Sequence, residues 1–115
     1  MLDLKIINGN CFINGNLEKQ DIGIKQGKIA DIGSLKEESK ETFNAENLTV
    51  LPGCIDTQVH FREPGSTDVE DLNSGSKAAV MGGITSVFEM PNTKPPTTNF
   101  EEFEKKNKHC KKNVL

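Results

Sequence analysis

Two apolar segments constrain the fold of this chain more than any other feature. They run from Leu48 to Phe61, broken by Pro52-Gly53, and from Ile84 to Met90, stopped by Pro91. Nearly continuous apolar runs of this length are typical of strands that are buried on both faces, as in a parallel sheet. Parallel neighbours need a long crossover connection, which is usually a helix. The two segments therefore predict a strand–helix–strand unit.

The residues between the two segments favour that helix. Thr67 and Glu70 have capping-box spacing, so the helix is expected to begin near them. Gly82-Gly83 is expected to end it. One face of the predicted helix carries four residues at helical spacing: Leu72, Ser76, Ala79 and Val80.

A second helix is predicted near the end of the chain, where Asn99 and Glu102 have N-cap spacing. Its acidic residues precede its lysines, the order that the helix dipole favours, and His109 is expected to have no role. Residues 113–115 are expected to begin another strand. The order of elements in residues 49–115 predicts the α/β class and the first βα units of a TIM-like (β/α)8 barrel. Such a barrel takes about 250 residues, so the chain is expected to be an incomplete, N-terminal fragment of a larger enzyme.

Residues 1–48 have a different pattern, in which short apolar runs are separated by turn signals. Tight turns with positive φ are predicted at three dipeptides: Asn8-Gly9, Asn14-Gly15 and Gln26-Gly27. Residues 34–46 are polar and are expected to form a loop or a short surface helix. This part is predicted to be a small antiparallel β unit that belongs to a β-sandwich domain, with the barrel domain beginning at residue 49.

The composition excludes several classes of function. A formal net charge of −3 and the absence of Trp and Tyr indicate no nucleic-acid surface. No segment approaches the roughly 18 apolar residues of a membrane helix. The first residues do not resemble a signal peptide, so a cytoplasmic location is expected. Cys11, Cys54 and Cys110 form no C-x-x-C pair, and buried or idle thiols are expected of them.

Polar functional groups gather at the end of the first apolar segment. Four of them recur at every second position and are expected to share one face of the strand: Asp56, Gln58, His60 and Arg62. Catalytic groups of such barrels lie at the C-terminal ends of strands, where His60 and Arg62 fall. A structural histidine and a metal ligand are both compatible with His60. Arg62 is the only arginine, and its planar fork favours binding of a substrate carboxylate over a surface salt bridge.

A proline-rich loop from Met90 to Pro96 follows the second apolar segment and is expected at the same end of the sheet. Its prolines stiffen the backbone, and Asn92 offers both a hydrogen-bond donor and an acceptor. A ligand-binding loop and a plain rigid turn both fit these residues.

Taken together, PGCIDTQVHFREPG, EDLNSGSKAAVMGGITSVFEMPN and TKPPTT resemble the amidohydrolase superfamily and, within it, class I dihydroorotases. The resemblance extends to about Thr98. It implies reversible hydrolysis of (S)-dihydroorotate to N-carbamoyl-L-aspartate in de novo pyrimidine biosynthesis. It also implies that Arg62 and Asn92 hold the substrate carboxylate, that His60 binds Zn²⁺, and that the catalytic aspartate and the other metal ligands lie beyond Leu115. The fragment by itself is expected to be inactive.

Gln58 departs from the family pattern, which has the first histidine of His-x-His at this position. A neutral amide oxygen is a poor zinc ligand beside an imidazole nitrogen, so a weakened site with one or two Zn²⁺ per full-length subunit is expected. An active enzyme and a non-catalytic subunit that supports aspartate transcarbamoylase both stay open. A related allantoinase or hydantoinase, a homodimer, and a free-standing small binding domain are further alternatives.

Overall fold

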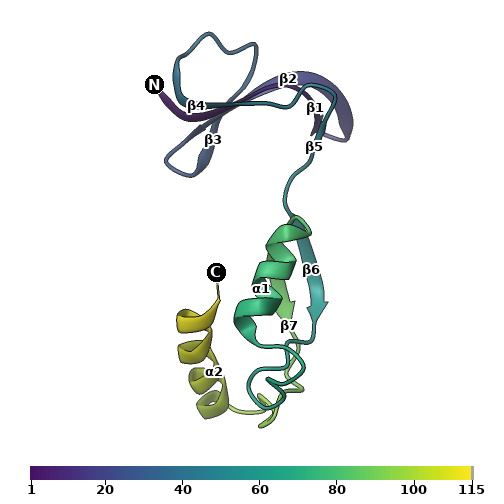
Figure 1. Cartoon of the computed structure of the whole chain (residues 1–115), viewed down its shortest axis with the longest axis vertical. Coiled ribbons are helices and arrows are strands. Elements are labelled where there is room, and N and C mark those ends of the chain that lie inside the picture. Colours follow the sequence, from purple (N-terminus) through teal and green to yellow (C-terminus); the bar gives the residue numbers. More distant parts are fainter. Residues whose placement is uncertain (115) are drawn as a thin grey trace. The chain divides into compact units, whose positions relative to one another are not determined.

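The computed structural model describes residues 1–114, which form two compact units, Met1–Pro52 and Gly53–Leu115. Each unit has its own sheet (Figure 1). Among the described residues, no helix is long and apolar enough to cross a membrane.

The first unit is a five-stranded sheet in which β1 pairs with three neighbours. Its strands are β1 (Leu2–Ile13), β2 (Asn16–Lys25), β3 (Lys28–Gly33), β4 (Ser39–Asn44) and β5 (Thr49–Val50). The pairs β1–β2 and β2–β3 are antiparallel, whereas β4 and β5 each pair with β1 in parallel. The prediction of a purely antiparallel unit is therefore wrong, since the sheet is mixed.

Strand β4 lies in residues 34–46, where a loop or a short helix was expected, so that expectation is also wrong. Its residues are almost all exposed, as an edge strand allows. Lys40 of β4 is paired with Asp3 of β1 at 2.6 Å. A polar segment can thus complete a sheet when backbone pairing, rather than apolar burial, holds it.

Two of the three predicted turns are confirmed. Asn14-Gly15 and Gln26-Gly27 have positive φ at both residues and join β1 to β2 and β2 to β3. The prediction of a turn at Asn8-Gly9 is wrong, because β1 continues through these residues with a register irregularity between Ile6 and Gly9. Asn8 has a φ of 63°, and a Cβ on Gly9 would lie 2.7 Å from the Val50 side chain. The Asn-Gly pair therefore makes a bulge beside a close contact.

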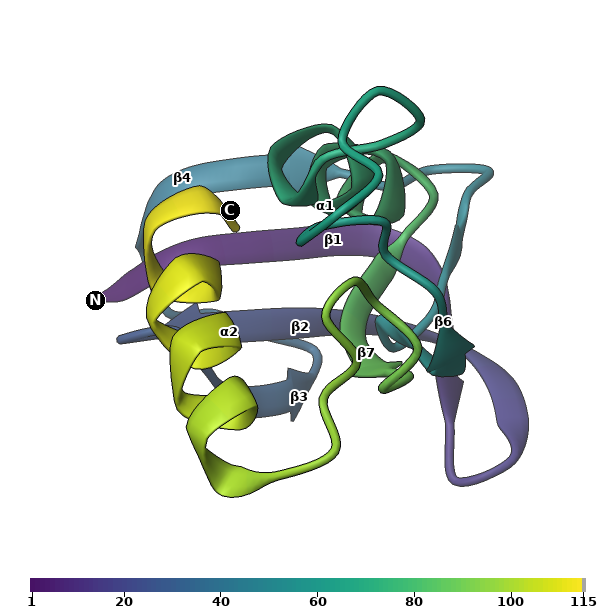
Figure 2. The same cartoon turned by 90° about the horizontal axis from the view of Figure 1, so that it is seen from below.

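The second unit has the order β6 (Cys54–Val59), α1 (Leu72–Met81), β7 (Ile84–Glu89) and α2 (Phe100–Asn113). Strands β6 and β7 pair in parallel, and α1 contacts both β7 and α2 (Figure 2). Phe61 and Leu72 are buried in its core, and a Cβ on Gly75 would lie 2.6 Å from the Phe61 ring. The predicted α/β class and the order of the βα units are confirmed.

The start of α1 corrects the capping prediction. Asp71 is the N-cap residue and accepts a hydrogen bond from the Ser74 N–H at 2.6 Å. Thr67 lies in a turn before the helix, and Glu70 also precedes it. The Leu72 N–H donates to the Glu63 carboxylate at 2.7 Å. A distant carboxylate and a local aspartate thus satisfy the first N–H groups, which sequence spacing alone does not reveal.

The second helix begins as predicted, since the Asn99 side chain accepts from the Glu102 N–H at 2.9 Å. Acidic residues occupy its first turn and lysines its last turn. The prediction of a strand over residues 113–115 is wrong for its first two residues, because Asn113 is the last residue of α2 and Val114 is its C-cap. Leu115 lies outside the described residues.

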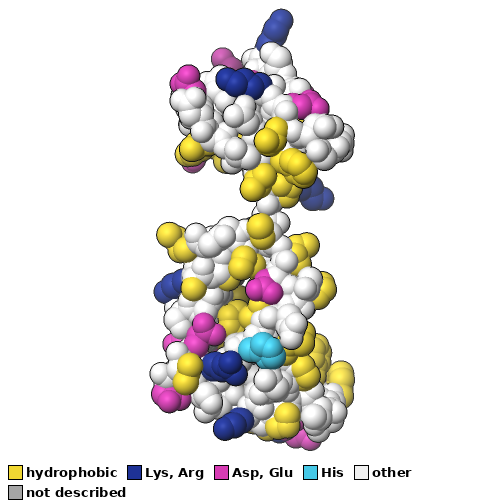
Figure 3. All heavy atoms as spheres, turned by 90° about the vertical axis from the view of Figure 1, so that its right-hand side faces the viewer, with side chains coloured by type: hydrophobic (Ala, Val, Ile, Leu, Met, Phe, Trp, Pro, Cys, Tyr) yellow, Lys and Arg dark blue, Asp and Glu magenta, His cyan; other side chains and the backbone are white. Residues whose placement is uncertain are grey.

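Apolar side chains remain on the surface of both units (Figure 3). In the second unit Ile55 of β6 and Phe88 of β7 are exposed. Strands of a complete barrel carry neighbours on both sides and side chains packed in the interior. Exposed apolar residues on β6 and β7 are therefore expected of the first strands of such a barrel.

Candidate functional site

The end of β6 places the predicted site residues on an exposed side of the chain. Gln58, His60 and Arg62 are exposed, whereas Phe61 and Glu63 between and after them are only 7% and 9% exposed. The alternation of the strand therefore continues beyond its last residue. Buried Phe61 and Glu63 anchor this segment while the side chains of His60 and Arg62 remain accessible.

His60 meets Asn92 across the two loops that follow the parallel strands. Nδ1 of the imidazole lies 2.9 Å from Oδ1 of the Asn92 amide. An amide oxygen can only accept, so Nδ1 carries the proton in this arrangement. The lone pair is then on Nε2, which is the form of a neutral histidine that can bind a metal through that atom.

Arg62 lies two positions after His60. Within the described residues 1–114 it makes no ion pair, and its side chain is exposed. The surface salt bridge considered as its alternative role is thus not formed with any residue that the structure describes. Asp56, on β6, is half-buried and accepts from the Gln58 backbone N–H at 3.0 Å.

Backbone contacts hold the two loops side by side. The Met90 N–H donates to the Val59 carbonyl at 2.8 Å, and the Lys94 N–H donates to the Pro64 carbonyl at 3.1 Å. Gly65 has a φ of 118°, and a Cβ there would lie 2.6 Å from the Lys94 carbonyl oxygen. Glycine is therefore required where the loops meet, because a side chain at this backbone conformation would be strained and would clash.

Beneath the loops lies a set of buried charges that the sequence did not indicate. The Glu63 carboxylate accepts from the Leu72 N–H at 2.7 Å and from Nε2 of His109 on α2. The Leu72 hydrogen bond, followed by that of His109, holds the pKa of Glu63 below its ordinary value. The expectation that His109 has no role is therefore wrong in structural terms, because it pairs with a buried carboxylate.

A second buried pair lies next to the first. Lys106, only 9% exposed, pairs with Glu89 at the end of β7 and reaches Oγ1 of Thr93 at 3.5 Å. Lys106 and His109 are three positions apart and therefore share one side of α2. This spacing was a signal available in the sequence, but only the packing of α2 identifies the buried side.

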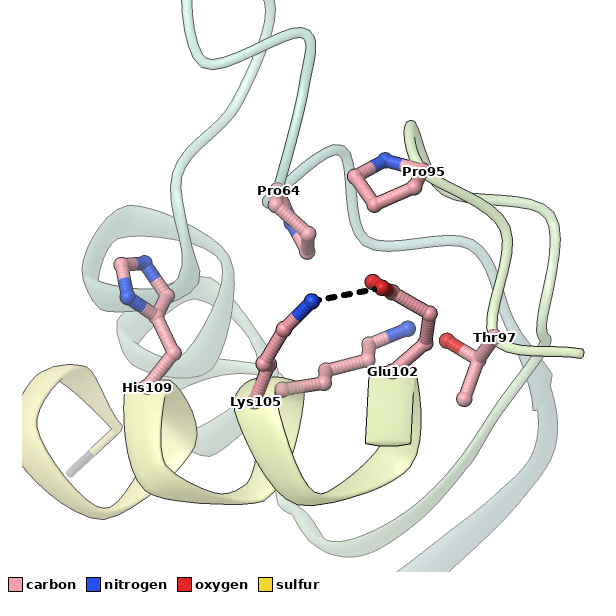
Figure 4. A pocket seen from close by; sticks show the side chains of 7 residues that line it. Pro64, Pro95, Thr97, Glu102, Lys105 and His109 are labelled. Carbon is pink, nitrogen blue, oxygen red and sulfur yellow. Dashed lines mark hydrogen bonds and ion pairs between the residues drawn. The ribbon is translucent and has the colours of Figure 1, made fainter. Parts of the chain in front are cut away.

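A cavity of about 190 Å³ lies between α2 and the two loops (Figure 4). Pro64 and Pro95 line its loop side, and Lys105 and His109 line its helix side. Lys105 is paired with Glu101 and Glu102 at 2.9 Å each. The hydrogen bond to Glu102, followed by that to Glu101, raises the pKa of the Lys105 ammonium group. Both lysines of this cavity, Lys105 and Lys106, are thus already paired with carboxylates, which makes it a poor anion site.

The thiols have three different environments. Cys11 is buried, Cys54 is exposed, and burial raises the pKa of the partly buried Cys110. All three are free cysteines. A raised pKa lowers the reactive thiolate fraction, so Cys110 fits the expectation of an idle thiol.

The donor groups of this chain do not form a complete metal centre. Among the described residues 1–114, no three His, Cys, Asp or Glu side chains are placed to hold an ion. His60 supplies one imidazole, and Gln58 supplies a neutral amide in place of a second ligand. A metal at His60 therefore needs further ligands from outside these residues.

The model of the amidohydrolase family matches residues 49–112 of this chain. Dihydroorotases of Thermococcus kodakarensis and Methanosarcina acetivorans are 41% and 43% identical over 88% and 100% of the chain, which spans 25% of each relative. An allantoinase of Rubrobacter xylanophilus is 43% identical over 88% of the chain and 23% of its own length.

Among solved structures, the L-hydantoinase of Arthrobacter aurescens is similar, with a TM-score of 0.84 and 32% identity over 94% of this chain and 25% of that one. The chain thus spans about a quarter of the length of the proteins that it matches. The similarity covers both the β6–α2 region and the preceding β-rich part.

Proposed function

Because the chain belongs to the amidohydrolase family, we propose that its second unit carries part of the substrate site of a cyclic amidohydrolase whose substrate is (S)-dihydroorotate. The complete enzyme would hydrolyse a ring C–N bond to give N-carbamoyl-L-aspartate, and would close the ring in reverse, as in de novo pyrimidine biosynthesis. Since the chain spans about a quarter of its relatives, this activity is proposed for a longer protein that contains it. The 115 residues alone are expected to be inactive.

The observation that carries this proposal is an exposed guanidinium, unpaired within residues 1–114, close in sequence to the hydrogen-bonded pair His60–Asn92. Dihydroorotate has a ring carboxylate, whereas allantoin and unsubstituted hydantoin rings have none. The planar fork of Arg62 matches a carboxylate through two parallel hydrogen bonds. Asn92 uses its oxygen toward His60 and keeps its NH₂ group as a donor to the same carboxylate.

Zinc dependence is part of the proposal and rests on the family. His60 is proposed as one metal ligand through Nε2, and Gln58 is proposed to weaken one of the metal positions. The remaining ligands and the catalytic aspartate are proposed to lie in the longer protein. The alternation that leaves His60 exposed beside Arg62 supports this assignment.

A second candidate is a non-catalytic subunit that supports aspartate transcarbamoylase. Gln58 favours it, because a chain that has lost a metal-binding histidine can keep the fold without the reaction. Co-purification with a transcarbamoylase, together with no hydrolysis of dihydroorotate, would support this candidate. The cytoplasmic location and a homodimeric assembly remain predictions.

The experiment is a parallel assay of the longer protein with dihydroorotate and with allantoin. Hydrolysis of dihydroorotate is expected, and Arg62→Lys is expected to raise its KM about tenfold or more with a smaller effect on kcat, because the charge stays but the two-pronged hydrogen bonding is lost. Lys77→Arg, at an exposed cation of α1, is the control and is expected to change neither constant. A preference for allantoin, or an unchanged KM in Arg62→Lys, would contradict the proposal.

A further inference from the structure

Helix α2 contacts the two loops through only one of its sides. Lys106 and His109 point into the loops, whereas Lys105, Lys108 and Lys111 are exposed. Figure 4 shows His109 and Lys105 on α2 facing the loop that contains Pro64. Lys105 lines the same cavity but pairs with glutamates of α2 itself. Lys106 and His109 instead pair with residues outside the helix, in or next to the loops that carry the candidate site.

We propose that α2 braces both loops, and that His109 and Lys106 are positioning residues for Arg62 and Asn92. The contacts of α2 with the two loops, called the brace below, are a property of the second unit. Their proposed purpose, substrate binding, rests on the proposed function. In this proposal, four residues orient the side chains of Arg62 and Asn92 without touching them: Glu63, Glu89, Lys106 and His109.

The first arm of the brace acts on Arg62 through its neighbour Glu63. Both oxygens of the Glu63 carboxylate are occupied, one by the Leu72 N–H and one by His109. This carboxylate joins the start of α1 to the last turns of α2 and is only 9% exposed. Glu63 is buried and its neighbour Arg62 is exposed, so fixing the Glu63 carboxylate restricts the backbone that carries Arg62.

The second arm acts on Asn92 through its neighbour Thr93. Thr93 is 6% exposed, and its hydroxyl donates to the Pro95 carbonyl at 3.0 Å. Nζ of Lys106 lies 3.5 Å from the Thr93 hydroxyl oxygen. Lys106 also pairs with Glu89, the last residue of β7. The start and the middle of this loop are therefore tied to one ammonium group.

The two arms are coupled by the hydrogen bond from the Lys94 N–H to the Pro64 carbonyl. A buried ion pair contributes little net stability, because loss of hydration offsets the charge attraction, but it restricts the orientation of the groups it joins. On one side of this helix, His109 pairs with Glu63, the neighbour of Arg62. Lys106 pairs with Glu89 and approaches Thr93, the neighbour of Asn92. This arrangement fits a positioning role better than a role in stability alone.

The test is amide hydrogen exchange and side-chain NMR of the full chain and four variants: His109→Gln, Lys106→Met, Lys106→Arg and the exposed control Lys111→Met. In His109→Gln and Lys106→Met the Leu72 and Lys94 amides are expected to exchange about tenfold faster or more, the change expected on losing a hydrogen bond to a charged group. The Arg62 Nε–H and Asn92 amide signals are expected to shift. Lys106→Arg is expected to restore the native pattern, and Lys111→Met to keep it.

The β1–β2 amides of the first unit serve as an internal reference that none of these changes should affect. Unchanged loop signals would overturn the proposal, as would an equal change in Lys111→Met or a Leu72 amide that is unprotected in the unsubstituted chain. Uniform loss of protection along β6 and β7 would also overturn it, since that outcome marks a purely structural role. No substrate enters this test, so its result is separate from the failure or success of the proposed hydrolysis.

Discussion

His60 and Asn92, 32 positions apart in the chain, are joined by a hydrogen bond of 2.9 Å between Nδ1 and Oδ1. The bond connects the loop after β6 with the loop after β7 and selects which imidazole nitrogen carries the proton. Asn92 therefore orients His60 in addition to its proposed role in substrate binding.

Removing the Asn92 side chain is expected to change the tautomer of His60. In the unsubstituted chain the proton resides on Nδ1, because the amide oxygen accepts there, and in Asn92→Ala this preference is lost. Nitrogen-15 NMR of the imidazole ring measures the protonated nitrogen directly. Asn107→Ala on α2 is the control. An identical ring spectrum in Asn92→Ala and the unsubstituted chain would contradict the assignment.

Gln58→His is expected to raise the zinc bound per chain in the longer protein, because it creates the paired imidazoles of the family pattern. Elemental analysis after dialysis measures the stoichiometry. Gln26→His, at an exposed turn of the first unit, adds a histidine away from the site and is expected to bind no additional zinc. Equal zinc content in the unsubstituted protein and Gln58→His would refute the explanation of the glutamine.

The second unit is expected to lose stability as the pH falls below 4.5, the ordinary pKa of a glutamate. The pKa of folded Glu63 is depressed by the Leu72 N–H and by His109, while Asp71 acts in the opposite direction. Its contribution is thus complete above pH 4.5 and is lost as the pH falls through the folded pKa.

Urea unfolding of the second unit between pH 7 and pH 3 tests this dependence. Glu63→Gln is expected to be less stable at pH 7 and to lose less stability on acidification. Glu46→Gln in the first unit is expected to leave the unfolding of the second unit unchanged. Parallel pH curves for Glu63→Gln and the unsubstituted chain would show that this carboxylate carries no such contribution.

Gly65→Ala is expected to destabilise the second unit by about 2 kcal/mol or more, because a φ of 118° strains any side chain and the new Cβ would clash with Lys94. Gly27→Ala is the comparison, since its φ is also positive but the space around it is open; about 1 kcal/mol is expected there. Denaturant unfolding of each unit gives both values. Equal costs would indicate that the loops do not meet at Gly65.

Asp71→Ala is expected to destabilise α1 by about 1 kcal/mol, the usual contribution of an N-cap side chain, whereas Thr67→Ala is expected to have almost no effect. The two substitutions distinguish the observed helix start from the start that spacing alone predicted. Thermal unfolding of the second unit measures both effects. A larger loss of stability in Thr67→Ala than in Asp71→Ala would show that Thr67 is the N-cap residue.

The sequence alone determined those features that depend on neighbouring residues. The apolar runs gave the parallel pair β6–β7, the Asn14-Gly15 and Gln26-Gly27 turns followed from positive φ, and Asn99 marked the start of α2. Alternation predicted accessible side chains for His60 and Arg62, and both are exposed. Each of these signals acts over a few residues, where covalent geometry and side-chain period decide the outcome.

Tertiary structure decided what depends on a distant partner. A polar segment became β4 because β1 offered unpaired backbone groups, and Asn8-Gly9 became a bulge because β1 continues past it. The first turn of α1 begins at Leu72 because Glu63 and Asp71 accept its N–H groups there, and His109 gains a role because α2 packs against Glu63. These partners are set by the path of the whole chain, and the stabilisation of a buried charge depends on which group that path brings to it.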